Sequence, residues 1–86
     1  MSHTNRFQTI VDVRTPEEYD EGHIEGAINI PLDQVQQRIT EFKEMEKPIV
    51  AYCRSGNRSG IAVRVLKQNG IEDAVNGGGI DDLRKN

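Results

Sequence analysis

The 86-residue chain lacks tryptophan and contains only two tyrosines, two phenylalanines and a single cysteine, Cys53. One cysteine excludes an internal disulfide and a zinc site built from several thiolates. Hydrophobic residues make up 35% of the chain, and no apolar run reaches the length that a transmembrane helix needs. We therefore expect residues 1–86 to form a single small domain around a thin hydrophobic core, with no membrane partner.

Acidic residues outnumber basic ones, and the two are unevenly distributed. Residues 1–46 contain ten acidic and four basic residues, whereas residues 47–86 contain four acidic and seven basic residues. The net charge of -3 disfavours non-specific binding to nucleic acid, so no nucleic-acid partner is expected. Between Lys47 and Asn69 there is no acidic residue, and Cys53 lies within this basic window.

The first residues of the chain lack the apolar segment of a signal peptide. A lone thiol also fits a reducing compartment. A cytoplasmic location is therefore expected, with a periplasmic mature form that has lost its signal peptide as the alternative. The two histidines, His3 and His23, form no ligand cluster with cysteines or acidic residues, so no metal is expected.

Short β-branched runs alternate with segments of helical spacing. The predicted strands cover residues 9–13, 27–30, 49–52 and 74–75. Residues 76–79, NGGG, are predicted to form a tight loop, and at most one helical turn follows them. This alternation predicts an α/β fold of three layers, α/β/α, with a small, mainly parallel sheet of about four strands.

The helices are predicted from capping and spacing signals. Thr15 and Glu18 have the spacing of a capping box for a first short helix. Asp33 is predicted to cap a second helix that continues as far as Pro48. A third helix is predicted from the glycine-bearing loop after Cys53 to Asn69.

The most informative stretch is YCRSGNRSG, which places Cys53 beside positive charge and flexible backbone. Cys53 directly follows a predicted strand, and sites in parallel sheets form at the carboxyl ends of strands. Since the thiolate is the reactive form, a site must lower the pKa of the thiol. The helix N-terminus and amides turned inward at Gly56 and Gly60 favour the thiolate, as do the charges of Arg54 and Arg58. The alternative is a buried, inert cysteine beside exposed arginines.

Three segments carry a resemblance to a known family: IVDVRTPEEYDEGHIEGAINIPL, KPIVAYCRSGNRSGIAVRVLKQNGI and VNGGGI. Over most of its length the chain resembles the rhodanese family of sulfurtransferases, most closely the short single-domain members of the phage-shock type. The resemblance implies a rhodanese-like domain in which Cys53 is the catalytic residue and no cofactor is needed. It also implies a substrate-binding loop made by the six residues that follow: Arg54, Ser55, Gly56, Asn57, Arg58 and Ser59.

By the same resemblance, Cys53 would take a sulfane sulfur from a small anionic donor such as thiosulfate and hold it as a persulfide. A thiol or cyanide would then accept the sulfur, and a protein acceptor is compatible with this chemistry. Arg54 and Arg58 are expected to bind the donor. Ser55 and Ser59 can each donate a hydrogen bond to the sulfur or cap the following helix. Of these roles, the cradle is expected for Ser55 and the cap for Ser59. The chain is expected to be a monomer.

A phosphatase or arsenate reductase, and a binding module, are the alternatives to a sulfurtransferase, and the loop bears on both. Phosphatases and arsenate reductases related to the rhodanese fold have five residues between cysteine and arginine, whereas four separate Cys53 from Arg58. A shorter ring of amides suits one sulfur atom better than a phosphoryl group. Some rhodanese-like domains serve only as binding modules, but these have lost the cysteine that this chain retains.

Three polar residues outside the loop are expected to act structurally. Asp12 lies in a strand of otherwise β-branched and apolar residues and is therefore expected to be hydrogen-bonded or ion-paired. Arg14 follows that strand and can approach the cysteine loop. For both residues, direct contact with substrate is the alternative. His23 is expected to hold a loop rather than act as a base.

Overall fold

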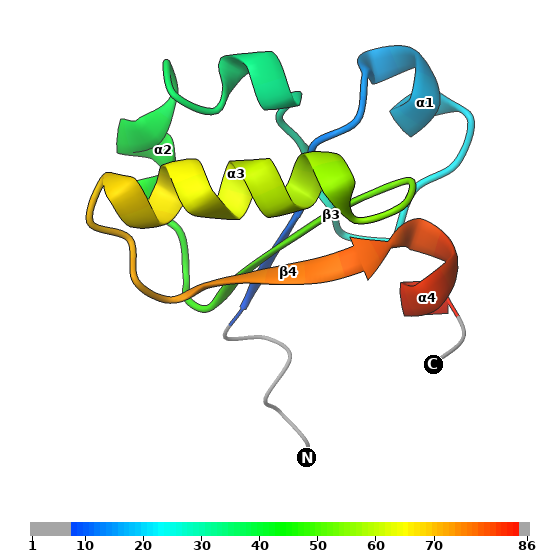
Figure 1. Cartoon of the computed structure of the whole chain (residues 1–86). Coiled ribbons are helices and arrows are strands. Elements are labelled where there is room, and N and C mark those ends of the chain that lie inside the picture. The colour runs from blue at the N-terminus through cyan, green and yellow to red at the C-terminus, as the bar shows by residue number, and fades with distance from the viewer. Residues whose placement is uncertain (1–7, 85–86) are drawn as a thin grey trace.

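The computed structural model describes residues 8–84, so His3 lies outside the described residues. Its elements are β1 (Thr9–Asp12), α1 (Pro16–Asp20), β2 (Ile28–Asn29), the 3-10 helix η2 (Leu32–Gln34), α2 (Ile39–Lys43), β3 (Ile49–Cys53), α3 (Asn57–Gln68), β4 (Ala74–Gly79) and α4 (Ile80–Arg84). Strands and helices alternate along the described chain, as the sequence predicts (Figure 1).

The four strands form a parallel sheet in the order β2-β1-β3-β4. Parallel neighbours need crossover connections, and these connections place helices on both faces. One face packs against α2 and α3 through buried side chains that include Phe42 and Leu66. The other face packs against α1 and α4 through a smaller cluster that includes Tyr19 and Ile80. The predicted three-layer α/β/α fold is therefore confirmed.

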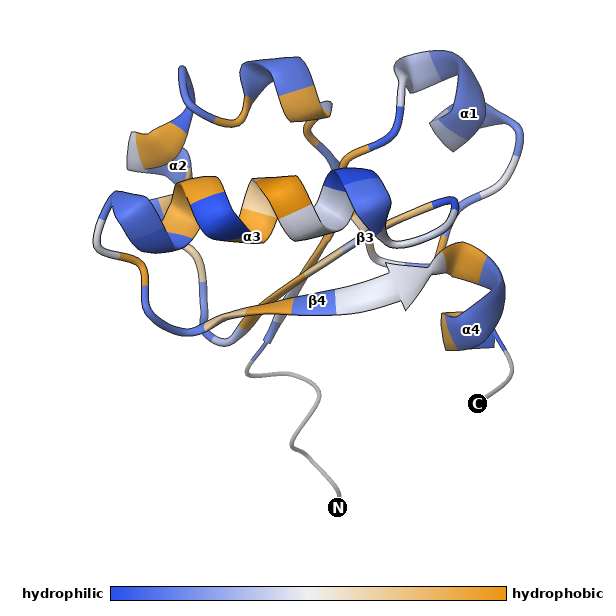
Figure 2. Cartoon of the chain, in the orientation of Figure 1, coloured by the Kyte–Doolittle hydropathy of each residue, from blue (hydrophilic) through white to orange (hydrophobic). Residues whose placement is uncertain are grey.

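Side chains of the central strands alternate between the two faces. Val11 and Ala51 belong to the larger cluster, whereas Ile10 and Tyr52 belong to the smaller one. In Figure 2 both ends of α3 are hydrophilic and its middle is mainly hydrophobic, interrupted by a hydrophilic stretch. Asp12 of β1 is in register with Tyr52 of β3, so the carboxyl ends of the two strands lie side by side.

Strand β4 is longer than predicted, because it continues through the glycines that the sequence analysis assigns to a tight loop. Ala51 pairs with Asn76 but Tyr52 pairs with Gly78, so Gly77 is an extra residue at a bulge. A Cβ at Gly77 would lie 2.9 Å from Cγ1 of Val50. The prediction of a loop was wrong because glycine here allows close packing of a strand and not only a turn.

The helix predicted from Asp33 to Pro48 is also corrected, since η2 and α2 replace it and turns separate them. Asp33 does not cap it: Pro31 is the N-cap residue of η2, without a side-chain hydrogen bond. Val35 and Phe42 of this segment are both buried, so core packing holds the segment without a continuous helix. Within residues 8–84, no helix is long and apolar enough to cross a membrane.

Candidate active site

The cysteine loop connects the central strand β3 to α3. Cys53 is the last residue of β3, and Asn57 is the first residue of α3. Gly56 is the N-cap residue of α3 and has a φ of 100°, a left-handed conformation that favours glycine. A Cβ at Gly56 would lie 3.3 Å from Cα of Gly78 in β4. The loop is therefore tightly turned and closely packed on the end of the neighbouring strand.

The sulfur of Cys53 lies among hydrogen-bond donors of this loop. The amide of Gly56 donates to Sγ at 3.0 Å and the amide of Ser59 at 3.4 Å. The hydroxyl of Ser59 lies 3.4 Å from the same atom. Burial raises the pKa of the Cys53 thiol, but hydrogen bonds from Ser59, Gly56 and the amide of Ser55 outweigh it and lower that pKa below its usual value. The loop thus favours a thiolate or another negatively charged sulfur.

Ser59 does not cap α3, contrary to the prediction. The N-cap residue is Gly56, which has no side-chain hydrogen bond, and Ser59 lies inside the first turn. Its fully buried hydroxyl donates to Oδ1 of Asn76 at 2.7 Å. Asn76 was missed by the sequence analysis, because nothing in the sequence links a β4 asparagine to a loop 17 positions earlier.

The two arginines of the loop have different surroundings. Arg58 donates two hydrogen bonds to the carboxylate of Glu18, at 2.8 and 3.1 Å. The side chain of Arg54 is 70% exposed, and its Nε lies 3.8 Å from the same carboxylate. The hydrogen bonds from Arg58 and from the amide of Thr15 lower the pKa of Glu18 to about 2. The charge of Arg58 is thus balanced by that of Glu18, and Arg54 is the cation more available to a ligand.

Glu18 reaches this position because the predicted capping box forms. The hydroxyl of Thr15 accepts a hydrogen bond from the amide of Glu18 at 3.2 Å, and the amide of Thr15 donates to Oε1 of Glu18 at 2.9 Å. The spacing of Thr15 and Glu18 predicts the helix cap, but nothing in the sequence predicts the ion pair of Glu18 with Arg58.

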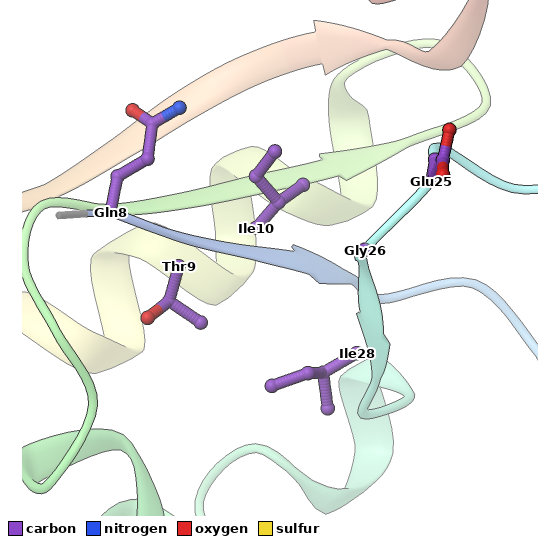
Figure 3. A pocket seen from close by; sticks show the side chains of 6 residues that line it. All are labelled: Gln8, Thr9, Ile10, Glu25, Gly26 and Ile28. Atoms are coloured by element: carbon purple, nitrogen blue, oxygen red, sulfur yellow. The ribbon is translucent and has the colours of Figure 1, made fainter. Parts of the chain in front are cut away.

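Hollows on two sides border the loop. One, of about 230 Å³, is lined by charged side chains that include Arg54, together with Arg14, Glu18, Glu21, Asp81 and Arg84. The other, of about 410 Å³, is bordered by Arg58 and by apolar residues that include Val13 and Leu32. A third hollow, shown in Figure 3, is lined by Gln8, Thr9, Ile10, Glu25, Gly26 and Ile28 and contains none of the predicted site residues.

Asp12 is ion-paired, as expected, and its partner is the buried Arg14, which the sequence did not identify as that partner. Nη2 of Arg14 donates to Oδ2 of Asp12 at 2.7 Å and to the carbonyl of Gly22 at 2.7 Å. The hydroxyl of Tyr52 donates to the same Oδ2 at 2.7 Å and accepts from the amide of Ile24 at 3.0 Å. The hydrogen bond with Asp12 raises the pKa of Arg14. This network braces the strand that ends in Cys53.

His23 lies in the segment that this network holds. Its Nδ1 is 2.9 Å from the carbonyl of Tyr19, and its ring stacks on that of Tyr19 with centroids 3.7 Å apart. These contacts fit the structural role that the sequence analysis expects.

Comparison with known proteins gives the family. The pattern of the rhodanese-like domain matches residues 1–85. Thiosulfate sulfurtransferase PspE from Escherichia coli (strain K12) is 40% identical over 74 residues, which are 85% of this chain and 71% of that protein. A tRNA uridine(34) hydroxylase from Escherichia fergusonii is 37% identical over 82 residues, 87% of this chain but 23% of that protein.

A solved structure of a rhodanese with anions from E. coli gives a TM-score of 0.79 at 39% identity, covering 87% of this chain and 89% of that one. The chain therefore belongs to the rhodanese-like family, as its sequence motifs predict. Its relatives include a sulfurtransferase and a hydroxylase, so membership of the family does not by itself define the reaction.

Proposed function

We propose that the chain is a sulfurtransferase that takes a sulfane sulfur from thiosulfate, or from a similar donor, and carries it as a persulfide on Cys53. The observation that supports this most is the convergence of the Gly56 and Ser59 amides on the buried sulfur. Such amides are worth most when the sulfur is charged. The Cys53 thiolate is a charged sulfur of this kind, and it is both the nucleophile that takes up the sulfur and the leaving group that gives it up.

The first step is an attack by the Cys53 thiolate on the outer sulfur of thiosulfate. A bond forms between the two sulfurs, the bond to the sulfite sulfur breaks, and sulfite leaves with its electron pair. The thiol proton passes to solvent before the attack. Thiosulfate is a dianion, so the exposed guanidinium of Arg54 is the group best placed to attract it.

The second step removes the sulfur. A thiol or cyanide attacks the outer sulfur of the persulfide and becomes a persulfide or thiocyanate, and the Cys53 thiolate is regenerated. Both steps are displacements at sulfur in which cysteine is the nucleophile and then the leaving group. A thiol on another protein can serve as acceptor by the same route.

The remaining loop residues have supporting roles in this proposal. Ser55 contributes a backbone amide, and Gly56 allows the left-handed turn that points its own amide at the sulfur. Asn57 begins the helix whose N-terminal end faces the sulfur. In this proposal Arg58 is held beside the loop by its ion pair with Glu18 and does not bind the donor directly.

The proposal is tested by measuring thiocyanate formed from thiosulfate and cyanide, with wild type and the Cys53→Ala and Ser55→Ala variants. Wild type and Ser55→Ala should produce thiocyanate, because the amide of residue 55 is kept, and Cys53→Ala should produce none. Hydrolysis of an aryl phosphate is measured in parallel. Aryl phosphate turnover without thiocyanate would favour the phosphatase alternative and overturn the proposal.

A further inference from the structure

Asn76, a residue of β4, contacts the cysteine loop at Gly56 and at Ser59. Its Nδ2 donates to the carbonyl of Gly56 at 3.1 Å, and its Oδ1 accepts from the amide of Gly78 at 2.9 Å. The same Oδ1 accepts from the hydroxyl of Ser59 at 2.7 Å. Asn76 therefore has three hydrogen-bond partners. Two of them belong to Gly56 and Ser59, the residues whose amides donate to the sulfur of Cys53.

These partners fix which end of the Asn76 amide faces Ser59. If the amide were turned over, its NH2 group would face the N–H of Gly78 and its oxygen would face the carbonyl of Gly56. Both contacts would then be repulsive, because donor would meet donor and acceptor would meet acceptor. The atom beside the Ser59 hydroxyl is therefore an oxygen, which can only accept.

A serine hydroxyl has one proton to donate. For Ser59 the two acceptors within reach are Oδ1 of Asn76 at 2.7 Å and Sγ of Cys53 at 3.4 Å. While the sulfur is a neutral thiol, its own S–H can donate to Ser59, and Ser59 can donate to Asn76. Once the sulfur is charged, it has no proton to give, and Ser59 can donate to it only by leaving Asn76.

We propose that Asn76 is a positioning residue that competes with the Cys53 sulfur for the hydroxyl proton of Ser59. Asn76 holds this proton while the sulfur is a thiol and releases it to the sulfur when the sulfur becomes charged. The inference deepens the proposed function, since the charged Sγ is the Cys53 thiolate that attacks the donor in that mechanism. The thiolate alone is enough to test it.

The competition has a consequence for reactivity. Each hydrogen bond to a thiolate lowers its basicity, and a less basic thiolate is a weaker nucleophile. Because Ser59 must leave Asn76 before it can donate to the thiolate, its hydrogen bond stabilises the thiolate less than it would without Asn76. The thiolate therefore keeps more of the nucleophilicity that attack on the donor requires.

The test is the pH dependence of the rate at which iodoacetamide alkylates Cys53, which needs no sulfur donor. It uses wild type, Asn76→Ala, Ser59→Ala and the double variant. Asn76→Ala should lower the apparent pKa of the thiol by about half a unit to one unit, the size of one hydrogen bond. Ser59→Ala should raise it by a similar amount, and Asn76→Ala should have no further effect in the Ser59→Ala background.

A merely structural role gives a different pattern. If Asn76 only braces the loop through the Gly56 carbonyl, its removal should raise the pKa, and by the same amount with or without the Ser59 hydroxyl. Either of these results would overturn the proposal. Asn69→Ala is the matched control: it loses side-chain hydrogen bonds to Val65 and Gln36 at the far end of α3 and should leave the alkylation profile unchanged.

Asn76→Asp covers the case in which Asn76→Ala does not fold. A carboxylate accepts the Ser59 proton more strongly and also repels a thiolate, so the pKa of the thiol should rise. Repulsion alone accounts for the rise in the thiol pKa that Asn76→Asp still causes when Ser59 is replaced by alanine. The proposal requires a larger rise when the Ser59 hydroxyl is present, and equal rises would contradict it. Because alkylation measures the thiol alone, a failure here is distinct from a failure of sulfur transfer.

Discussion

The carboxylate of Glu18 accepts two hydrogen bonds from the guanidinium of Arg58, which lies 40 positions further along the chain. The pair links the first turn of α1 to the first turn of α3, on either side of the cysteine loop. It separates the roles of the two loop arginines, because Arg58 is held in place and Arg54 remains exposed.

Replacing Glu18 should change how stability depends on pH. Its folded pKa of about 2 lies below the ordinary value of 4.5. The contribution of Glu18 is therefore complete above about pH 4.5 and is lost as the pH falls toward 2. At neutral pH, Glu18→Gln should lower the free energy of unfolding by about 1 kcal/mol, since a cap and an ion pair are both weakened.

Urea unfolding of wild type and Glu18→Gln at pH 7 and at pH 3 measures this difference. The gap between the two proteins should be smaller at pH 3 than at pH 7. Glu17→Gln is the matched control, because Glu17 is exposed on the same helical turn. A difference in the free energy of unfolding that is independent of pH, or one that Glu17→Gln reproduces, would contradict this account. It would show that the charge of Glu18 does not stabilise the fold through Arg58.

Removing the charge of Arg54 should weaken the binding of an anionic donor. Arg54→Ala should raise the KM for thiosulfate by about three- to tenfold with little change in kcat, the size expected for one exposed charge. The effect should shrink as salt is added, because screening acts on exposed charges. Arg64→Ala, at an exposed position of α3, is the control. An equal rise in the KM for thiosulfate in both variants would mean that only the overall charge of the protein affects donor binding.

Gly79 should be required for the shape of the loop. A Cβ there would lie 2.5 Å from the carbonyl oxygen of Arg54 and 3.3 Å from Cα of Ser55. Gly79→Ala should therefore displace the loop and slow sulfur uptake by more than about tenfold, since misplacement on the order of 1 Å is costly in catalysis.

Gly70→Ala serves as the comparison for that variant. Gly70 has a φ of 91° but no atom within 4 Å of an added Cβ, so its substitution strains the backbone without touching the loop. Circular dichroism and thermal unfolding establish that both variants fold. Normal sulfur uptake by folded Gly79→Ala would contradict the close packing of β4 on the loop.

Breaking the buried ion pair should be the most destabilising of these changes. In Asp12→Asn, the guanidinium of Arg14 stays buried without a counter-charge, and Tyr52 loses a carboxylate acceptor. The expected cost is about 3 to 5 kcal/mol, measured by urea unfolding. Asp20→Asn, at an exposed position of α1, should cost far less. A cost under about 1 kcal/mol for Asp12→Asn would be inconsistent with the observed network.

The sequence predicted the parts of this protein that rest on local patterns. The alternation of β-branched runs with capped helices gave the parallel α/β fold, and Asp12 was expected to be paired because charge in a strand is costly when unpaired. The helix expected after Asp33 failed because packing of Val35 and Phe42 overrode local spacing. Likewise, the glycines after Asn76 extend a strand instead of forming a turn.

The candidate site was predicted only where its residues are contiguous. Cys53 and the loop to Ser59 form one run of sequence, so their spacing carries the information. Glu18 and Asn76 reach the loop from distant elements, α1 and β4, and their contacts depend on how the helices and strands pack. Long-range hydrogen bonds of this kind leave no period or motif in a single sequence.

The central claim is that sulfur resides on Cys53, and the most direct test is the intact mass of the protein after incubation with thiosulfate in the absence of reducing agent. Wild type should gain the mass of one sulfur atom and lose it again when cyanide is added, with release of thiocyanate. Cys53→Ala, the control, should gain nothing. An unchanged wild-type mass, or an equal gain in Cys53→Ala, would contradict a Cys53 persulfide formed from thiosulfate.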